Sequence, residues 1–206
     1  MRLFTAWGIV AVVVLQIAIF PSTGTATSRA DYNYVFENQK VLTFTLSMTG
    51  KAFEKMQPIR KEPNLEQASA RSIFAQEFPY ASATVTCDGA VYPNAGVRYR
   101  GNASIVIIPP GGKKPLKVDF DRFDEEQNFH GFSKLNFINS FRDPSMLRDK
   151  LTYDLYHRAG VPAPRAAFAN LYLSLDGKPE EHLGFFVAVE QVNAPFLEKH
   201  FGNRNG

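Results

Sequence analysis

Hydrophobic and polar residues alternate along several short segments of this chain. In residues 42–48, Leu42, Phe44, Leu46 and Met48 alternate with threonine and serine, a pattern typical of a strand that buries one face. Glycine, proline or aspartate separates most of these segments, so the pattern predicts a sheet-rich, mainly antiparallel domain. Further strands are predicted at 84–86, 92–100, 116–120, 134–139, 166–174 and 183–192.

Two local signals predict how the first half of the chain turns. Cys87-Asp88-Gly89-Ala90 lies between the strands at 84–86 and 92–100, and its Asp-Gly pair suits a tight hairpin turn. A short helix is predicted from Gly50 to Met56, ending before Pro58.

One longer helix is predicted from Pro144 to Ala159. Asp143 is the expected N-cap and Gly160 the expected C-terminal cap. Its apolar stripe is expected to pack on the sheet and to draw the head group of Arg148 toward it. The alternative is that Arg148 runs along the edge of the stripe with its head group in water. The stripe consists of Leu147, Leu151, Leu155 and Ala159.

Candidate chemistry centres on the end of the strand at 92–100. Arg98 and Arg100 are two residues apart and therefore share one face, and Gly101 follows as a turn residue. Arginine binds phosphate oxygens in a forked geometry, so this segment is a candidate phosphate cradle. The alternative is an ordinary solvated strand face.

Two further charged residues extend this hypothesis. If the strand at 116–120 pairs with the strand at 92–100, Lys117 lies near Arg98 and Arg100. Glu190 follows an apolar strand, and Arg148 or Lys117 is its expected partner. A plain surface glutamate at a strand end is the alternative interpretation of Glu190.

Composition narrows the possible functions. The chain has 206 residues and a net charge of +3, too small a surplus to indicate a nucleic-acid binder. Cys87 is the single cysteine, which excludes an internal disulfide and a cysteine zinc cluster and suggests a small buried side chain. The four histidines show no metal-ligand spacing.

The N-terminus resembles an export signal. Arg2 precedes an apolar run from Trp7 to Phe20, and small residues follow, so we expect a signal peptide at 1–26 and a linker at 27–34. An uncleaved membrane anchor is the alternative. Both interpretations place the domain outside the cytoplasm, secreted, periplasmic or at the cell surface.

Five sequence motifs follow one another along the chain, at 97–104 (VRYRGNAS), 114–120 (KPLKVDF), 134–136 (KLN), 143–151 (DPSMLRDKL) and 183–192 (LGFFVAVEQV). Together they closely resemble the CotH family of secreted, spore-coat-type proteins with an atypical kinase fold. The resemblance covers residues 35–206 and implies a CotH-like kinase domain, here its N-terminal portion. The implied fold class is α+β, a mainly antiparallel sheet with one packed helix, like the small lobe of a protein kinase.

The resemblance implies ATP- and Mg-dependent phosphorylation of exported coat or surface proteins. It assigns Arg100 to Ser104 to the phosphate loop and Lys117 to the phosphate-contacting lysine, with Lys134 as a rival. It makes Arg148 a supporting helix residue and Glu190 the hinge beside adenine. The predicted nucleotide-binding residues are Arg98, Arg100, Gly101, Asn102, Ser104, Lys117, Lys134, Arg148 and Glu190.

No catalytic or metal-binding residue is assigned by the resemblance. Relatives continue into a C-terminal lobe that carries the catalytic aspartates, and residues 35–206 have no counterpart of it. We therefore expect this chain by itself to be inactive. The alternative function is a non-catalytic extracellular coat or surface module whose basic face binds an acidic protein or glycan.

Overall fold

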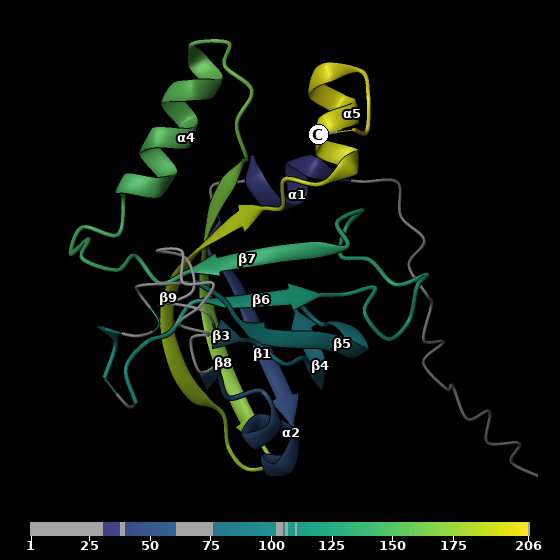
Figure 1. The fold of residues 1–206 in the computed structure, drawn as a ribbon, viewed down its shortest axis with the longest axis vertical. Coiled ribbons are helices and arrows are strands. Elements are labelled where there is room, and N and C mark those ends of the chain that lie inside the picture. Colours follow the sequence, from purple (N-terminus) through teal and green to yellow (C-terminus); the bar gives the residue numbers. More distant parts are fainter. Residues whose placement is uncertain are drawn as a thin grey trace, which may run out of the picture.

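Seven strands form a closed barrel in the computed structural model (Figure 1). The structure describes residues 31–37, 40–60, 76–101, 105, 107–109 and 111–205. Around the barrel the strands follow the order β1-β4-β5-β6-β7-β9-β8. Their bounds are β1 (Leu42–Met48), β4 (Ala81–Cys87), β5 (Ala90–Tyr99), β6 (Leu116–Asp119), β7 (Lys134–Ile138), β8 (Ala166–Leu175) and β9 (Glu181–Glu190).

The remaining elements lie around this barrel. β2 and β3 form a separate two-stranded sheet. α2 lies beside the lower end of the barrel, whereas α1, α4 and α5 lie at its upper end (Figure 1). The bounds are α1 (Tyr32–Phe36), α2 (Gly50–Lys55), β2 (Ile59–Arg60), β3 (Gln76–Glu77), α4 (Arg148–Arg158) and α5 (Ala194–Phe201).

The barrel closes through one parallel pair. β1 pairs in parallel with β8, from Leu42 opposite Ala169 to Met48 opposite Leu175, while the other neighbouring strands are antiparallel. Closure leaves no open sheet edge, so the backbone groups of β1 and β8 find partners in each other.

The barrel interior is filled mainly by aromatic and branched side chains. Phe120 and Phe129 stack with ring centroids 5.3 Å apart, and Phe44 meets Phe129 at 5.2 Å and Phe137 at 5.1 Å. Burial of such large apolar surfaces is the main force that stabilises the fold. Cys87 is also buried, as expected from the sequence.

The fold class inferred from the sequence is wrong. The sheet is a closed seven-stranded barrel rather than the α+β small lobe of a kinase with one packed helix. The parallel contact of β1 with β8 joins residues more than a hundred positions apart, and no local pattern predicts it. The chain therefore closes into a barrel where a kinase-like small lobe was expected.

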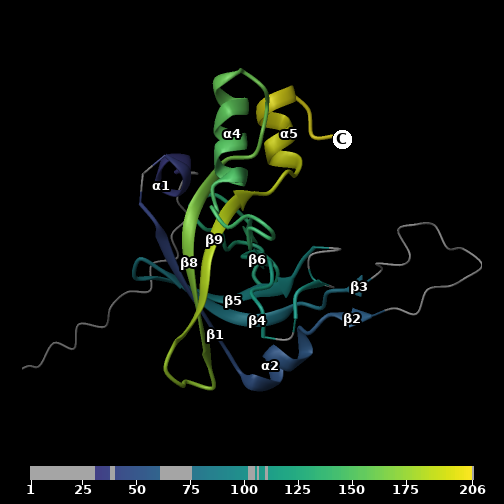
Figure 2. The same cartoon turned by 90° about the vertical axis from the view of Figure 1, so that its left-hand side faces the viewer.

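The long helix also differs from the prediction. α4 begins at Arg148 rather than at Pro144, and in Figure 2 it extends away from the barrel. Asp143 accepts hydrogen bonds from the backbone N–H groups of Ser145 (3.2 Å) and Arg148 (2.9 Å), and Met146 has a left-handed φ of 57°. This turn replaces the first helical turn. The leucines of the predicted stripe, Leu147, Leu151 and Leu155, are exposed.

Most local predictions are confirmed. The hairpin between β4 and β5 turns at Asp88 and Gly89, which have φ values of 49° and 83°, and α2 occupies the predicted short helix. α1 lies partly within the range expected to be linker, and the predicted signal peptide lies outside the described residues. Within the described ranges, no helix is both long and apolar enough to cross a membrane.

Candidate functional site

The register of four strands brings the candidate residues into one row. Arg98 of β5 lies opposite Lys117 of β6, which lies opposite Asn136 of β7, and Asn136 lies opposite Val189 of β9. The preceding row, which includes Val118 and contributes to the core, faces the barrel interior. The row from Arg98 to Val189 therefore points outward, because successive strand residues alternate between faces. We call this row, together with Arg100, the outer face.

Lys117 is the central cation of the outer face. Its side chain is half-buried, and burial together with the charge of neighbouring Arg98 lowers the pKa of its ammonium below the usual range. Among the residues that the structure describes, no carboxylate lies within ion-pair distance of it. The charge of Asp119 acts to raise the pKa of Lys117, but it forms no direct ion pair with this lysine. A partly desolvated cation without a direct ion pair favours binding of an anion.

Arg98 is held beside Lys117 by an aromatic contact. Its guanidinium lies 5.2 Å from the ring centroid of Tyr80, whose hydroxyl donates a hydrogen bond to Asp119 at 3.0 Å. The Nε atom of Arg98 is buried and has no hydrogen-bond partner in the described part of the chain. A buried donor without an acceptor is costly, so this unpaired Nε–H marks Arg98 as a candidate ligand contact.

Arg100 and Gly101 complete the turn after β5. Burial and the charge of Arg98 lower the pKa of Arg100, and Tyr153 of α4 acts in the opposite direction. Gly101 has a φ of 109°, a value that favours glycine. The two other predicted phosphate-loop residues, Asn102 and Ser104, lie outside the described residues.

Lys134, the rival for the role of Lys117, is neutralised by two carboxylates. Its ammonium lies 3.0 Å from Asp121 and 3.3 Å from Asp119. Burial acts to lower the pKa of Lys134, but the hydrogen bond that its ammonium donates to Asp121 and the charge of Asp119 raise it overall. Lys117 is consequently better placed than Lys134 to bind a phosphate.

Glu190 lies on the opposite face of the barrel wall from Lys117. It is opposite Leu135, one row along from Asn136 and Val189, and only 6% exposed. Arg165 donates to its two carboxylate oxygens at 3.1 and 2.9 Å, and the guanidinium of Arg165 lies 5.0 Å from the Phe36 ring centroid. The expectation that Arg148 or Lys117 pairs with Glu190 is wrong.

Arg148 is not drawn toward the sheet. Its side chain is 72% exposed, and its nearest carboxylate is Asp143 at 3.5 Å. The expected inward position fails because the leucine stripe beside it does not pack on the barrel. The structure therefore separates Arg148 and Glu190 from the cations of the outer face.

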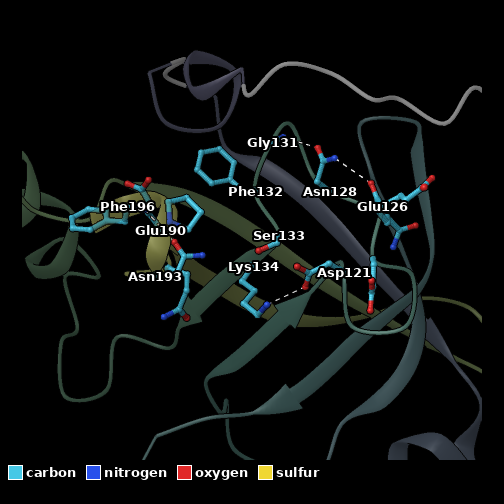
Figure 3. Close-up of a pocket in the computed structure, with 14 residues that line it drawn as sticks. Asp121, Glu126, Asn128, Gly131, Phe132, Ser133, Lys134, Glu190, Asn193 and Phe196 are labelled. Atoms are coloured by element: carbon cyan, nitrogen blue, oxygen red, sulfur yellow. Dashed lines mark hydrogen bonds and ion pairs between the residues drawn. The ribbon is translucent and has the colours of Figure 1, made fainter. Parts of the chain in front are cut away.

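A pocket of about 330 Å³ lies at the α5 end of the barrel (Figure 3). Lys134 and Glu190 both line it, and in Figure 3 the Lys134 ammonium points to Asp121. Glu125 and Glu126 line it as well. Asp121 is paired with Lys134 and Glu190 with Arg165, so Glu125 and Glu126 add negative charge that disfavours phosphate. This pocket is therefore a poorer phosphate site than the outer face.

Asn136 is a candidate that the sequence reasoning did not assign. Its Nδ2 donates to the side-chain oxygen of Gln191 at 3.2 Å and to the backbone oxygen of Val189 at 3.5 Å. The residue is 5% exposed, and its Oδ1 has no partner within the described ranges. The sequence does contain a signal for this residue, since a polar amide stands between the apolar Leu135 and Phe137 in a strand.

The outer face has residues suited to phosphate but not to a metal ion. Arg98, Arg100 and Lys117 provide positive charge, as nucleotide phosphates require. No group of three histidine, cysteine, aspartate or glutamate residues able to hold a metal ion occurs in the parts of the chain described. The described residues of the outer face therefore offer contacts for the phosphates of a nucleotide.

Two comparisons with known proteins bear on the family of this chain. A stretch of 77 residues is 30% identical to "Inner spore coat protein H" of Bacillus subtilis (strain 168). It covers 37% of this chain and 20% of that protein, so the match spans about a fifth of this relative. The family model described as "CotH kinase protein" matches residues 97–206, more than half of the chain, from β5 to the C-terminal helix. This chain therefore belongs to the CotH family.

Proposed function

We propose that this chain contributes the nucleotide-binding part of a CotH-type kinase that uses ATP to phosphorylate exported coat or surface proteins. The family description names a kinase, and the Bacillus subtilis relative is named as a spore coat protein. The observation that carries the proposal is the half-buried Lys117, which lies beside Arg98 with no carboxylate at ion-pair distance in the described ranges. A coat-associated location outside the cytoplasm follows from the same relationship.

The outer face offers the contacts that phosphate oxygens require. Lys117 acts as a compact point charge, while Arg98 presents a planar guanidinium with a buried Nε–H that lacks an acceptor. Arg100 follows on the same side of β5, next to the glycine turn. Burial and, after it, the repulsion from Arg98 lower the pKa values of Lys117 and Arg100 in the free protein, and phosphate binding would relieve that repulsion.

The apolar residues beside the phosphate contacts are buried. Val187 and Val189 are 0% and 5% exposed and form an apolar cluster on the outward side of β9, with Tyr153 of α4 packed against it. The nucleotide contacts proposed here are therefore those of the phosphates. Glu190 acts here as a positioning residue, because its pairing with Arg165 anchors the end of β9 next to Val189.

Phosphoryl transfer needs more than these contacts. Transfer requires groups that hold the metal and orient the attacking hydroxyl. Asp119 and Asp121 are adjacent carboxylates, but Lys134 neutralises them. The contacts proposed here therefore concern nucleotide binding and not the transfer step.

Calorimetric titration of the purified chain with ATP and Mg tests the proposal. Lys117→Ala and Arg98→Ala should each raise the Kd for ATP at least tenfold, about 1.4 kcal/mol, because each removes a charged hydrogen bond. Lys51→Ala, an exposed lysine of α2, is the matched control and should leave the Kd unchanged. Equal binding by all four proteins, or binding by none, would contradict the nucleotide role.

A second candidate function is a non-catalytic coat module whose outer face binds an acidic protein. The name of the Bacillus subtilis relative favours it. Poly-glutamate and ATP distinguish the two candidates. Binding of poly-glutamate that requires Lys117, without binding of ATP, would support the module and overturn the kinase proposal.

A further inference from the structure

An apolar cavity opens at the end of the barrel next to α2. It has a volume of about 440 Å³ and is formed by the ends of β1 and β8, the start of β9, α2 and residues 111–114. In Figures 1 and 2, α2 lies at this lower end, away from α4 and α5. The lining is mostly apolar and includes Leu46, Met48, Met56, Tyr99, Leu116 and Phe186.

Lys113 fixes one side of this cavity. Its ammonium donates to the backbone oxygen of Phe185 at 2.7 Å and lies 5.1 Å from the Phe186 ring centroid. A Cβ atom at position 184 would lie 2.8 Å from the Lys113 side chain, so Gly184 leaves the space through which this side chain passes over β9. The amide of Asn139 donates to the Lys113 backbone oxygen at 2.8 Å. The segment that carries both rim lysines is therefore held against β7 and β9.

The two lysines on the rim lack counter-ions. Lys114 lies 5.2 Å from the Tyr99 ring centroid, and burial lowers the pKa of Lys113. Neither has a carboxylate at ion-pair distance in the portion of the chain described. Glu54 and Glu181 also line the cavity, but both are exposed to solvent.

We propose that this barrel mouth binds one amphipathic carboxylate, with its alkyl chain in the apolar cavity and its head group at Lys113 and Lys114. The volume lies in the range of small-molecule sites, about 300–1,000 Å³, and barrel mouths commonly hold such ligands. An alkyl chain gains free energy from leaving water, and the carboxylate provides the missing counter-ion. Tyr99 and Leu116 line this cavity from the inward side of β5 and β6, the strands that carry Arg98 and Lys117. The site is therefore separate from the outer face.

Methyl NMR of protein labelled at methionine Cε tests the site with decanoate as the probe. Met48 and Met56 line the cavity, whereas Met146 lies before α4 and provides an internal reference. Decanoate should shift the Met48 and Met56 signals saturably and leave the Met146 signal in place. Absence of a saturable shift, or equal shifts at Met146, would overturn the proposal.

Two variants and one neutral probe test the head-group contact. Lys114→Glu should raise the Kd for decanoate at least fivefold, while Lys51→Glu on the exposed side of α2 should not. 1-Decanol should bind more weakly than decanoate, and equal affinity would overturn the carboxylate contact. Lys117→Ala should leave the decanoate titration unchanged, so the site can fail or succeed independently of ATP binding.

Discussion

The wall formed by β5, β6, β7 and β9 has a buried ion pair on its inner side and, on its outer side, two neighbouring cations without an ion pair in the described ranges. On the inner side, the one carboxylate at the end of β9, Glu190, is paired with Arg165 in two hydrogen bonds. On the outer side, Arg98 and Lys117 lie next to each other, and burial and their repulsion lower the pKa of Lys117. The paired charge stabilises the fold, whereas the unpaired cations are available to a ligand. Substitutions on the two faces should therefore separate stability from binding.

The largest effect is expected at the inner charge pair. Glu190→Ala removes both carboxylate hydrogen bonds of the buried Arg165 guanidinium and should lower the free energy of unfolding by about 3–5 kcal/mol. Glu198→Ala is the control, because it breaks the exposed pair with Arg204 and should cost at most about 1 kcal/mol. Urea unfolding followed by circular dichroism measures both. Similar losses in the two variants would show that the inner pair does not stabilise the barrel.

A large effect is also expected for an apolar side chain inside the barrel and a small one on α4. Leu171 is 0% exposed, so Leu171→Ala should cost about 2–5 kcal/mol through lost burial and the cavity left behind. Leu155 is 62% exposed, and Leu155→Ala should change stability by no more than about 0.5 kcal/mol. The same urea titration compares them. A loss above 2 kcal/mol at Leu155 would mean that the α4 stripe is buried after all.

A smaller effect is expected on the outer side, in the pH dependence of ATP binding at Lys117. Burial and Arg98 lower the pKa of Lys117, so this lysine loses its proton at a lower pH than an ordinary lysine. ATP affinity should fall as pH rises through this lowered pKa. Between the lowered pKa of the folded state and the ordinary lysine pKa of the unfolded state, the unfolded chain binds more protons at Lys117. The contribution of Lys117 to stability therefore rises with pH across this range.

Lys117→Arg provides the matched control for the pH profile. Arginine keeps its charge throughout this range, so the variant should bind ATP with a flatter pH dependence than the native chain. Calorimetric titrations at several alkaline pH values measure both proteins. Identical pH profiles would exclude Lys117 as the titrating group.

The sequence was a good guide to local structure and to part of the candidate site. Alternation located the strands, Asp88-Gly89 located a hairpin, and the pairing of β5 with β6 places Lys117 opposite Arg98 as predicted. The prediction that the apolar stripe of α4 packs on the sheet is wrong. Apolar periodicity predicts which residues share a face of a helix, but not whether another element covers that face. The sequence did not single out Asn136, because it is a candidate only through its Oδ1 atom. Whether that atom has a hydrogen-bond partner depends on the tertiary structure.

The sequence alone determined the strands, the turns and membership of the CotH family. These features depend on residues close together in the chain or on motifs in a given order. The tertiary structure decided that β8 closes the barrel on β1, that Lys134 is neutralised while Lys117 is not, and that Glu190 pairs with Arg165. Each of these outcomes depends on which side chain lies opposite another across strands distant in sequence, and sheet register sets that arrangement.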